Sequence, residues 1–97
     1  MVEHSYIAKQ PYIKVIRELS STKQRECIDR RNIYLYIDKL VTKRREFPLT
    51  DVFDLSFRKI GSKGGILLIH TNHGVYSYTV TTSPLPFIQI CKRYLMT

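Results

Sequence analysis

Residues 47–82 constrain the fold of this 97-residue chain more than any other stretch. Apolar and polar residues alternate there with the period of two that is typical of half-buried strands, and glycine-containing turns interrupt the alternation. The pattern predicts three consecutive antiparallel strands at residues 52–60, 66–71 and 75–81. The residues expected to share a face are Phe53, Leu55 and Phe57, pointing inward from the first strand, and Tyr76, Tyr78 and Val80 in the third.

An amphipathic helix is predicted directly after these strands. Ser83 is a good N-cap, and Pro84 suits the first helical position because a proline there loses no hydrogen bond. Apolar residues then recur at helical spacing on one face, namely Phe87, Ile90, Cys91, Tyr94 and Leu95. Such a stripe needs an apolar cover, so we expect the helix to pack against the sheet formed just before it.

The first half of the chain shows weaker strand patterns, except at residues 31–38, where the alternation is clear. The predicted elements are strands at residues 12–19, 23–29, 31–38 and 40–42, a turn at 20–22 and a break at 30–32. The apolar faces expected are Ile13, Val15 and Leu19 in the first of these strands, and Ile33, Leu35 and Ile37 in the third. Four successive charged residues at 43–46 are more typical of an exposed hairpin end than of a binding site.

Size and composition indicate one domain spanning residues 1–97, with the first ten or so residues allowed to lie outside the fold. Hydrophobic residues make up 43% of the chain, and its aromatic residues are mostly tyrosine, which favours strands. The net charge is +8, and no acidic residue follows Asp54. A basic surface of this kind attracts polyanions, although moderate positive charge also serves simply to keep a small protein dissolved.

The sequence favours a cytoplasmic protein. Its longest apolar run, residues 66–69, is too short to cross a bilayer, and the first residues lack a secretory signal. Cys27 and Cys91 are far apart and form no C-x-x-C pair. We expect them to be two separate reduced thiols, as is usual in the cytoplasm.

No residue cluster reaches the specificity of a catalytic or cofactor motif. His70 and His73 form an H-x-x-H pair, but it straddles a predicted turn and no Cys, Asp or Glu follows it closely. Asp51 and Asp54 would fall on opposite faces of a strand. The chain also has no G-x-S-x-G, P-loop or G-x-G-x-x-G motif. We therefore expect no catalytic residues, no metal, no cofactor and no enzyme activity.

Four segments within residues 31–95 follow one another in a characteristic order: N-I-Y-L-Y-I-D, E-F-P-L-T-D-V-F-D-L, G-G-I-L-L-I-H-T-N-H-G-V-Y-S-Y and S-P-L-P-F-I-Q-I-C-K-R-Y-L. This order resembles that of pleckstrin-homology-like (PH-like) domains, in particular small bacterial proteins of that superfamily. The resemblance implies a mainly β fold, either a barrel or two curved antiparallel sheets of six to seven strands, capped by a C-terminal helix. It also implies a binding module rather than an enzyme.

The resemblance further implies a phosphate-binding cluster. Phosphoinositide-binding members carry Lys on the first strand, then a basic residue, one spacer and Arg on the second. Lys14, Lys23 and Arg25 match that spacing, and Arg17 lies between them. Lys and Arg bind phosphate through charge-assisted hydrogen bonds. With the charged hairpin end added, the anion-binding candidates are Lys14, Arg17, Lys23, Arg25, Lys43, Arg44 and Arg45.

Nucleic acid is another possible ligand of these basic residues. Tyr34 and Tyr36 would form a stacking platform beside the arginines at 30–31 and 44–45. The alternative is that these tyrosines pack beneath another element or a partner.

Two hypotheses on function follow from the sequence. In the first, the protein is a binding or assembly module that recognises a protein segment, added along a sheet edge, or a second copy of itself. In the second, it binds anionic phospholipid headgroups or nucleic acid electrostatically. Salt separates them, because polyanion binding weakens steeply as salt rises and an apolar interface does not.

Overall fold

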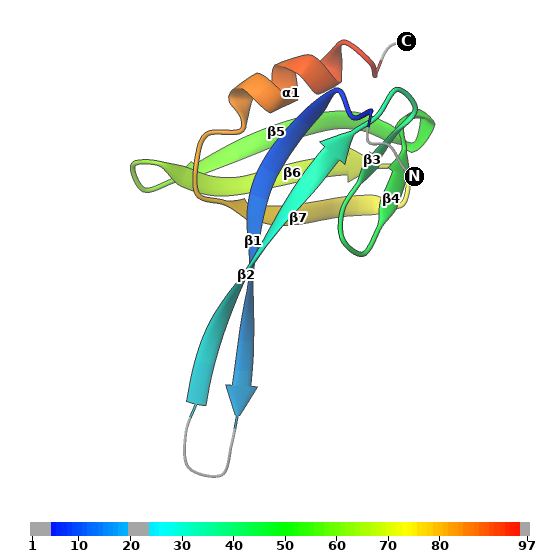
Figure 1. Cartoon of the computed structure of the whole chain (residues 1–97). Coiled ribbons are helices and arrows are strands. Elements are labelled where there is room, and N and C mark those ends of the chain that lie inside the picture. The colour runs from blue at the N-terminus through cyan, green and yellow to red at the C-terminus, as the bar shows by residue number, and fades with distance from the viewer. Residues whose placement is uncertain (1–4, 20–23, 96–97) are drawn as a thin grey trace.

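The computed structural model describes residues 5–19 and 24–95 of the chain. In this part, seven antiparallel strands form one sheet, and one α-helix follows at the C-terminal end (Figure 1). The predicted class, mainly β with a C-terminal helix, is therefore confirmed. The sheet is not closed into a barrel.

The sheet consists of two halves joined at one place. The elements are β1 (Ala8–Leu19), β2 (Gln24–Leu35), β3 (Lys39–Val41), β4 (Glu46–Pro48), the short 3-10 helix η1 (Leu49–Asp51), β5 (Val52–Ile60), β6 (Gly64–Thr71), β7 (Gly74–Val80) and α1 (Leu85–Lys92). Their order in the sheet is β4-β3-β2-β1-β7-β6-β5. β1 and β7, where the halves meet, share the residue pair Ile13 and Thr79. The buried core draws on both halves and on the helix.

Strands β5, β6 and β7 confirm the three strands predicted from residues 47–82. β6 is central, because it pairs with β5 on one side and β7 on the other. Its burial alternates strictly, and Leu67 and Ile69 are fully buried. The β6–β7 turn ends at Gly74, whose φ of 135° is a conformation that glycine adopts without strain. The residues that share one face of β7 are, as predicted, Tyr76, Tyr78 and Val80.

Helix α1 packs against β5 and β1, as expected for a helix that covers the sheet. Its buried residues are Phe87, Ile88 and Cys91. The helix begins at Leu85, so Pro84 occupies the N-cap position that was predicted for Ser83. The backbone N–H of Leu85 still donates a hydrogen bond to Ser83 Oγ at 3.3 Å. The helix ends at Lys92, so the predicted apolar stripe is wrong at Tyr94, which lies beyond the helix and is exposed.

Phe53 points outward, contrary to the prediction. The pairing of β5 with β6 shifts between Val52 and Asp54, so Phe53 is the extra residue of a β-bulge. An extra residue reverses the alternation of faces. For this reason Val52 and Leu55 are both buried, while 66% of Phe53 is exposed.

Strands β1 and β2 form one long ribbon instead of the interrupted strands predicted. They pair along their whole length, from Ala8 opposite Leu35 to Leu19 opposite Gln24. Residues 30–32 therefore lie inside β2 and do not break it. β1 begins within the first ten residues, and the predicted turn at 20–22 lies outside the described residues.

The far half of this ribbon projects from the body of the molecule (Figure 1). The predicted apolar face of the first strand is therefore wrong at Val15, which is 44% exposed. The side chain of Leu19 lies outside the described part. Ile37 is also exposed, because β2 ends at Leu35 and Ile37 lies in the turn before β3.

Candidate anion-binding groove

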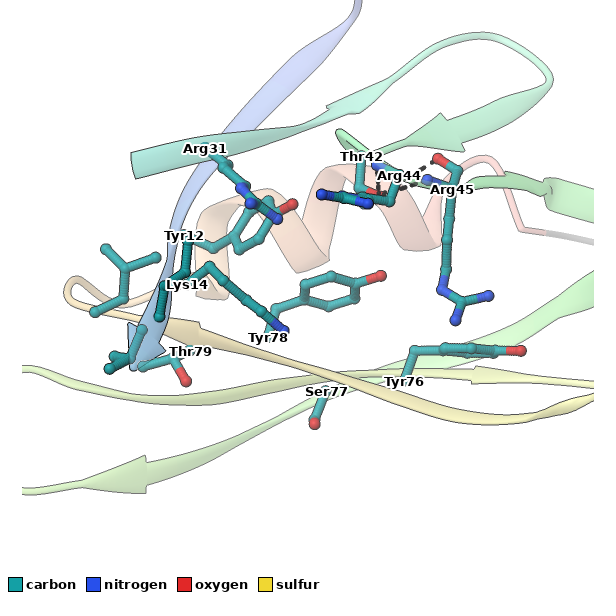
Figure 2. Close-up of a pocket in the computed structure, with 13 residues that line it drawn as sticks. Tyr12, Lys14, Arg31, Thr42, Arg44, Arg45, Tyr76, Ser77, Tyr78 and Thr79 are labelled. Atoms are coloured by element: carbon teal, nitrogen blue, oxygen red, sulfur yellow. Dashed lines mark hydrogen bonds between the residues drawn. The ribbon is translucent and has the colours of Figure 1, made fainter. Parts of the chain in front are cut away.

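A groove of about 820 Å³ opens between the β1–β2 ribbon, the β3–β4 turn and β7 (Figure 2). Its polar lining consists of the cations Lys14, Arg31, Arg44 and Arg45, the tyrosines Tyr12, Tyr76 and Tyr78, and the hydroxyl-bearing residues Thr42, Ser77 and Thr79. Among the described residues that line it, none is Asp or Glu. The lining itself therefore carries positive charge, part of which Asp29 balances from beside the groove.

The ribbon supplies one side of the groove. Tyr12 and Lys14 are two residues apart in β1 and so share a face, and Arg31 of β2 lies directly opposite Tyr12. Asp29 holds the Arg31 guanidinium, with Nη2 and Nε each 2.8 Å from Oδ2. This hydrogen bonding lowers the pKa of Asp29 and raises that of Arg31, so both groups stay charged.

Arg44 and Arg45 approach from the turn between β3 and β4. Thr42 Oγ1 accepts hydrogen bonds from the backbone N–H groups of Arg44 and Arg45, at 3.3 and 3.1 Å (Figure 2). The backbone N–H of Thr42 donates to the carbonyl oxygen of Arg45 at 2.8 Å. A threonine hydroxyl can thus replace a backbone acceptor within a tight turn. Because Thr42 is buried, the turn presents both guanidinium groups from a fixed backbone.

Strand β7 supplies an aromatic wall. Tyr78 packs edge-on against Tyr12, with ring centroids 4.9 Å apart. Arg45 Cζ lies 4.7 Å from the ring centroid of Tyr76. Burial raises the pKa of Tyr78, so its hydroxyl stays neutral and keeps a proton to donate. The wall therefore offers apolar rings and polar hydroxyls to a ligand.

Three of the predicted anion-binding residues come together in this groove, namely Lys14, Arg44 and Arg45. Lys43 belongs to the same turn, but its Nζ lies 3.6 Å from Asp29 Oδ2 and it lines a separate, smaller hollow. The turn itself is exposed at residues 43–45, as predicted.

The remaining predicted cluster does not assemble in the described residues. Arg17 is on the opposite face of β1 from Lys14, and its Nε lies 3.2 Å from Glu26 Oε2. Arg25 lies farther out along the ribbon, opposite Glu18. Lys23 lies outside the described residues. The spacing that suggested this cluster ignored the alternation of strand faces, which separates Arg17 from Lys14.

The groove tyrosines were not predicted as site residues, and Arg31 was predicted only as one of the arginines beside the platform of Tyr34 and Tyr36. The shared face of Tyr76 and Tyr78 is the signal that the sequence offers for the tyrosines, whereas Arg31 falls in the break predicted at residues 30–32. The expected platform of Tyr34 and Tyr36 does not line the groove. Tyr34 lies on the other face of β2 and packs against Tyr6, with ring centroids 5.0 Å apart.

The two histidines of the H-x-x-H pair face different partners. His70 Nε2 lies 2.8 Å from Ser56 Oγ, and His73 Nε2 lies 3.8 Å from Asp51 Oδ2. Over residues 5–19 and 24–95, no group of three or more His, Cys, Asp or Glu side chains is placed to hold a metal ion. Cys27 and Cys91 are both free thiols, the first exposed and the second buried.

Fold and groove together define a small, mainly β domain with a basic, tyrosine-walled groove. No family model matches the chain, and no curated protein matches it either. In the part of the chain that the structure describes, no helix is long and apolar enough to cross a membrane. Inferences on function therefore rest on the chemistry of the groove.

Proposed function

We propose that this protein is a non-enzymatic binding module of the PH-like type, whose groove binds a phosphate-bearing ligand. The observation that carries the proposal is the meeting of Lys14, Arg44 and Arg45 around one hollow, beside an Arg31 that Asp29 pairs and with no carboxylate among the described lining residues. Seven antiparallel strands followed by one helix support the PH-like assignment. The groove thus favours the second functional hypothesis, anion binding, over the first.

The cations approach from two sides, which suits a compact anion. Arg44 and Arg45 extend from the β3–β4 turn, while Lys14 and Arg31 extend from the ribbon (Figure 2). Guanidinium groups bind phosphate oxygens in a bidentate manner, and an ammonium group acts as a point charge. A phosphate group between the two sides would receive charge-assisted hydrogen bonds from both.

The size of the groove favours a headgroup over a polymer. Its volume of about 820 Å³ is typical of sites for small molecules, which span roughly 300–1,000 Å³. A phosphorylated lipid headgroup and a free phosphate compound present the same chemistry there. A nucleic-acid strand needs a longer basic track. Beyond the groove, Arg17 and Lys43 are each paired with a carboxylate.

Binding without catalysis suits the lining residues. The titratable groups among them are arginine, lysine and tyrosine, which hold a phosphate without providing a general base that operates near neutral pH. The cytoplasm stays the proposed compartment, on the sequence grounds given above.

Titration calorimetry with inositol hexakisphosphate tests the proposal. We expect Arg45→Glu to weaken binding by about tenfold or more, because it replaces an attractive charge with a repulsive one. Arg58→Glu is the matched control, since Arg58 is an exposed residue of β5 outside the groove. A groove variant that binds as tightly as this control would overturn the proposal.

Binding measurements with lipid vesicles and with an oligonucleotide distinguish the kinds of phosphate-bearing ligand. Binding to vesicles that contain phosphatidylinositol bisphosphate, lost in Arg45→Glu, would identify a lipid headgroup. Binding to inositol hexakisphosphate without binding to vesicles would identify a free phosphate compound. Binding to single-stranded DNA alone would contradict the small-ligand proposal.

A protein segment or a second copy is the other candidate partner, and exposed apolar residues favour it. Val15, Ile28 and Phe53 are 44%, 59% and 66% exposed. Val15 and Ile28 belong to the projecting ribbon, whereas Phe53 belongs to β5. Association through them should survive salt that abolishes phosphate binding.

A further inference from the structure

The outer half of the β1–β2 ribbon has free edges. Among the described residues, β1 pairs with β7 only at Ile13, and β2 pairs with β3 only at Tyr34 and Leu35. Residues 24–30 of β2 therefore present unpaired backbone N–H and C=O groups on their outer side. Such an edge is a template for another strand.

The ribbon is also incomplete in its packing. A two-stranded hairpin is marginally stable in water, and a third strand is the usual source of further stability. Apolar residues are exposed on both faces of the ribbon. Val15 lies opposite Ile28 on one face, and Ile16 lies opposite Cys27 on the other. A strand added at the edge would remove part of this surface from water.

The charges of the ribbon indicate what kind of partner would pair with its free edge. Residues 14–19 and 24–30 contain four basic and three acidic residues, a net charge of +1, in a chain whose net charge is +8. A polyanion gains little from so balanced a surface. A second copy of the ribbon, in contrast, offers opposite charges at matching spacing.

We propose that two copies of the chain associate through their β2 edges, which pair antiparallel across a two-fold axis to give a four-stranded sheet in the order β1-β2-β2-β1. An axis at Cys27 places Arg25 of each copy opposite Asp29 of the other. A register that places Arg25 opposite Arg30 is excluded, because opposed residues must point to the same face and a two-fold axis normal to the sheet keeps each residue on its own face.

Asp29 has a free oxygen for this contact. Within the described part of its own chain, its contacts with Arg31 and Lys43 both use Oδ2. The other carboxylate oxygen, Oδ1, is therefore left for Arg25 of the second copy. The proposal does not depend on the groove or on its ligand.

Oxidation of the unmodified full chain gives a direct test. Opposed residues of antiparallel strands have Cα atoms about 4.5–5.5 Å apart, within the range of about 4.4–6.8 Å that a disulfide spans. Copper-phenanthroline is expected to link Cys27 to Cys27 of the second copy, as a dimer on non-reducing electrophoresis located by peptide mass mapping. Cys91 is buried and serves as the unreactive internal control.

Sedimentation equilibrium tests the non-covalent dimer. Arg25→Glu is expected to raise the dimer dissociation constant by about tenfold or more, because two repulsive pairs replace two attractive ones. Arg58→Glu, the same change on β5, should leave the constant unchanged, and Cys27→Ser should abolish the crosslink while keeping the dimer. Circular dichroism shows whether each variant is folded.

Four results would overturn the proposal. The first is a chain that stays monomeric up to millimolar concentration, and the second is a crosslink that does not involve Cys27. The third is a folded Arg25→Glu variant that dimerises like wild type. The fourth is a folded Arg25→Glu variant that loses polyanion binding and nothing else.

Discussion

The guanidinium group of Arg45 lies over the ring of Tyr76, with Cζ 4.7 Å from the ring centroid (Figure 2). This pair connects the β3–β4 turn to β7, which belong to different halves of the sheet. Tyr76 also contacts Phe47 of β4, with ring centroids 5.0 Å apart. One aromatic ring therefore positions a candidate phosphate-binding side chain and joins the two halves.

Removing this ring should affect both binding and stability. We expect Tyr76→Leu to weaken binding of inositol hexakisphosphate a few-fold, because Arg45 loses the surface that orients it, and to lower the free energy of unfolding by about 1 kcal/mol. Calorimetry and urea denaturation measure the two effects. Tyr76→Phe keeps the ring and should behave like wild type. Equal losses in both variants would show that the hydroxyl matters and the ring does not.

The hydroxyl of Thr42 should be essential to the turn that carries Arg44 and Arg45. Thr42→Val keeps the shape of the side chain but removes the acceptor of two backbone N–H groups. We expect a loss of roughly 1–3 kcal/mol in the free energy of unfolding, together with weaker phosphate binding. Thr42→Ser restores the hydroxyl and should recover both. Urea denaturation that shows Thr42→Val to be as stable as wild type would contradict this role.

Gly65 should tolerate no side chain. A Cβ atom at this position would overlap the backbone carbonyl oxygen of Arg58 in the paired strand β5. We expect Gly65→Ala to lower the free energy of unfolding by about 1–3 kcal/mol, since two paired strands cannot easily separate. Gly61→Ala, in the open β5–β6 turn, has space for the methyl group and carries only the strain of its φ of 74°. A smaller loss for Gly61→Ala, measured by urea denaturation, would agree with the observed pairing of β5 and β6.

The buried thiol of Cys91 should make the protein less stable in alkali. Burial raises the pKa of Cys91 to about 12 in the folded protein, from 9.0 for an ordinary thiol. Between these values the unfolded chain has released the proton and the folded protein has kept it, so stability falls as the pH rises. The expected slope is roughly 1 kcal/mol per pH unit, relative to a Cys91→Val variant that cannot ionise. Urea denaturation across this pH range measures it, and equal slopes in wild type and Cys91→Val would contradict the prediction.

Much of the C-terminal half was predictable because its signals are local. The alternation along β6 and β7 depends on which neighbouring residues are apolar, and Gly74 marks a turn by its own conformational freedom. Local signals likewise predict α1, namely Ser83, the prolines at its start and the apolar residues at helical spacing. The outward position of Phe53 was not predictable, because a bulge arises from the pairing of two strands and not from either strand alone.

The candidate site, like the fold, was predictable from the sequence only in part. The sequence by itself determined that the chain is basic, that it builds mainly strands closed by a helix, and that Lys14, Arg44 and Arg45 are available for an anion. Only the tertiary structure decided that these cations meet Arg31 and the tyrosines of β7 at one groove. The physical reason is that strand formation depends on residues close in sequence. The meeting of these side chains depends instead on the register between β1 and β2 and on the contact between the two halves of the sheet.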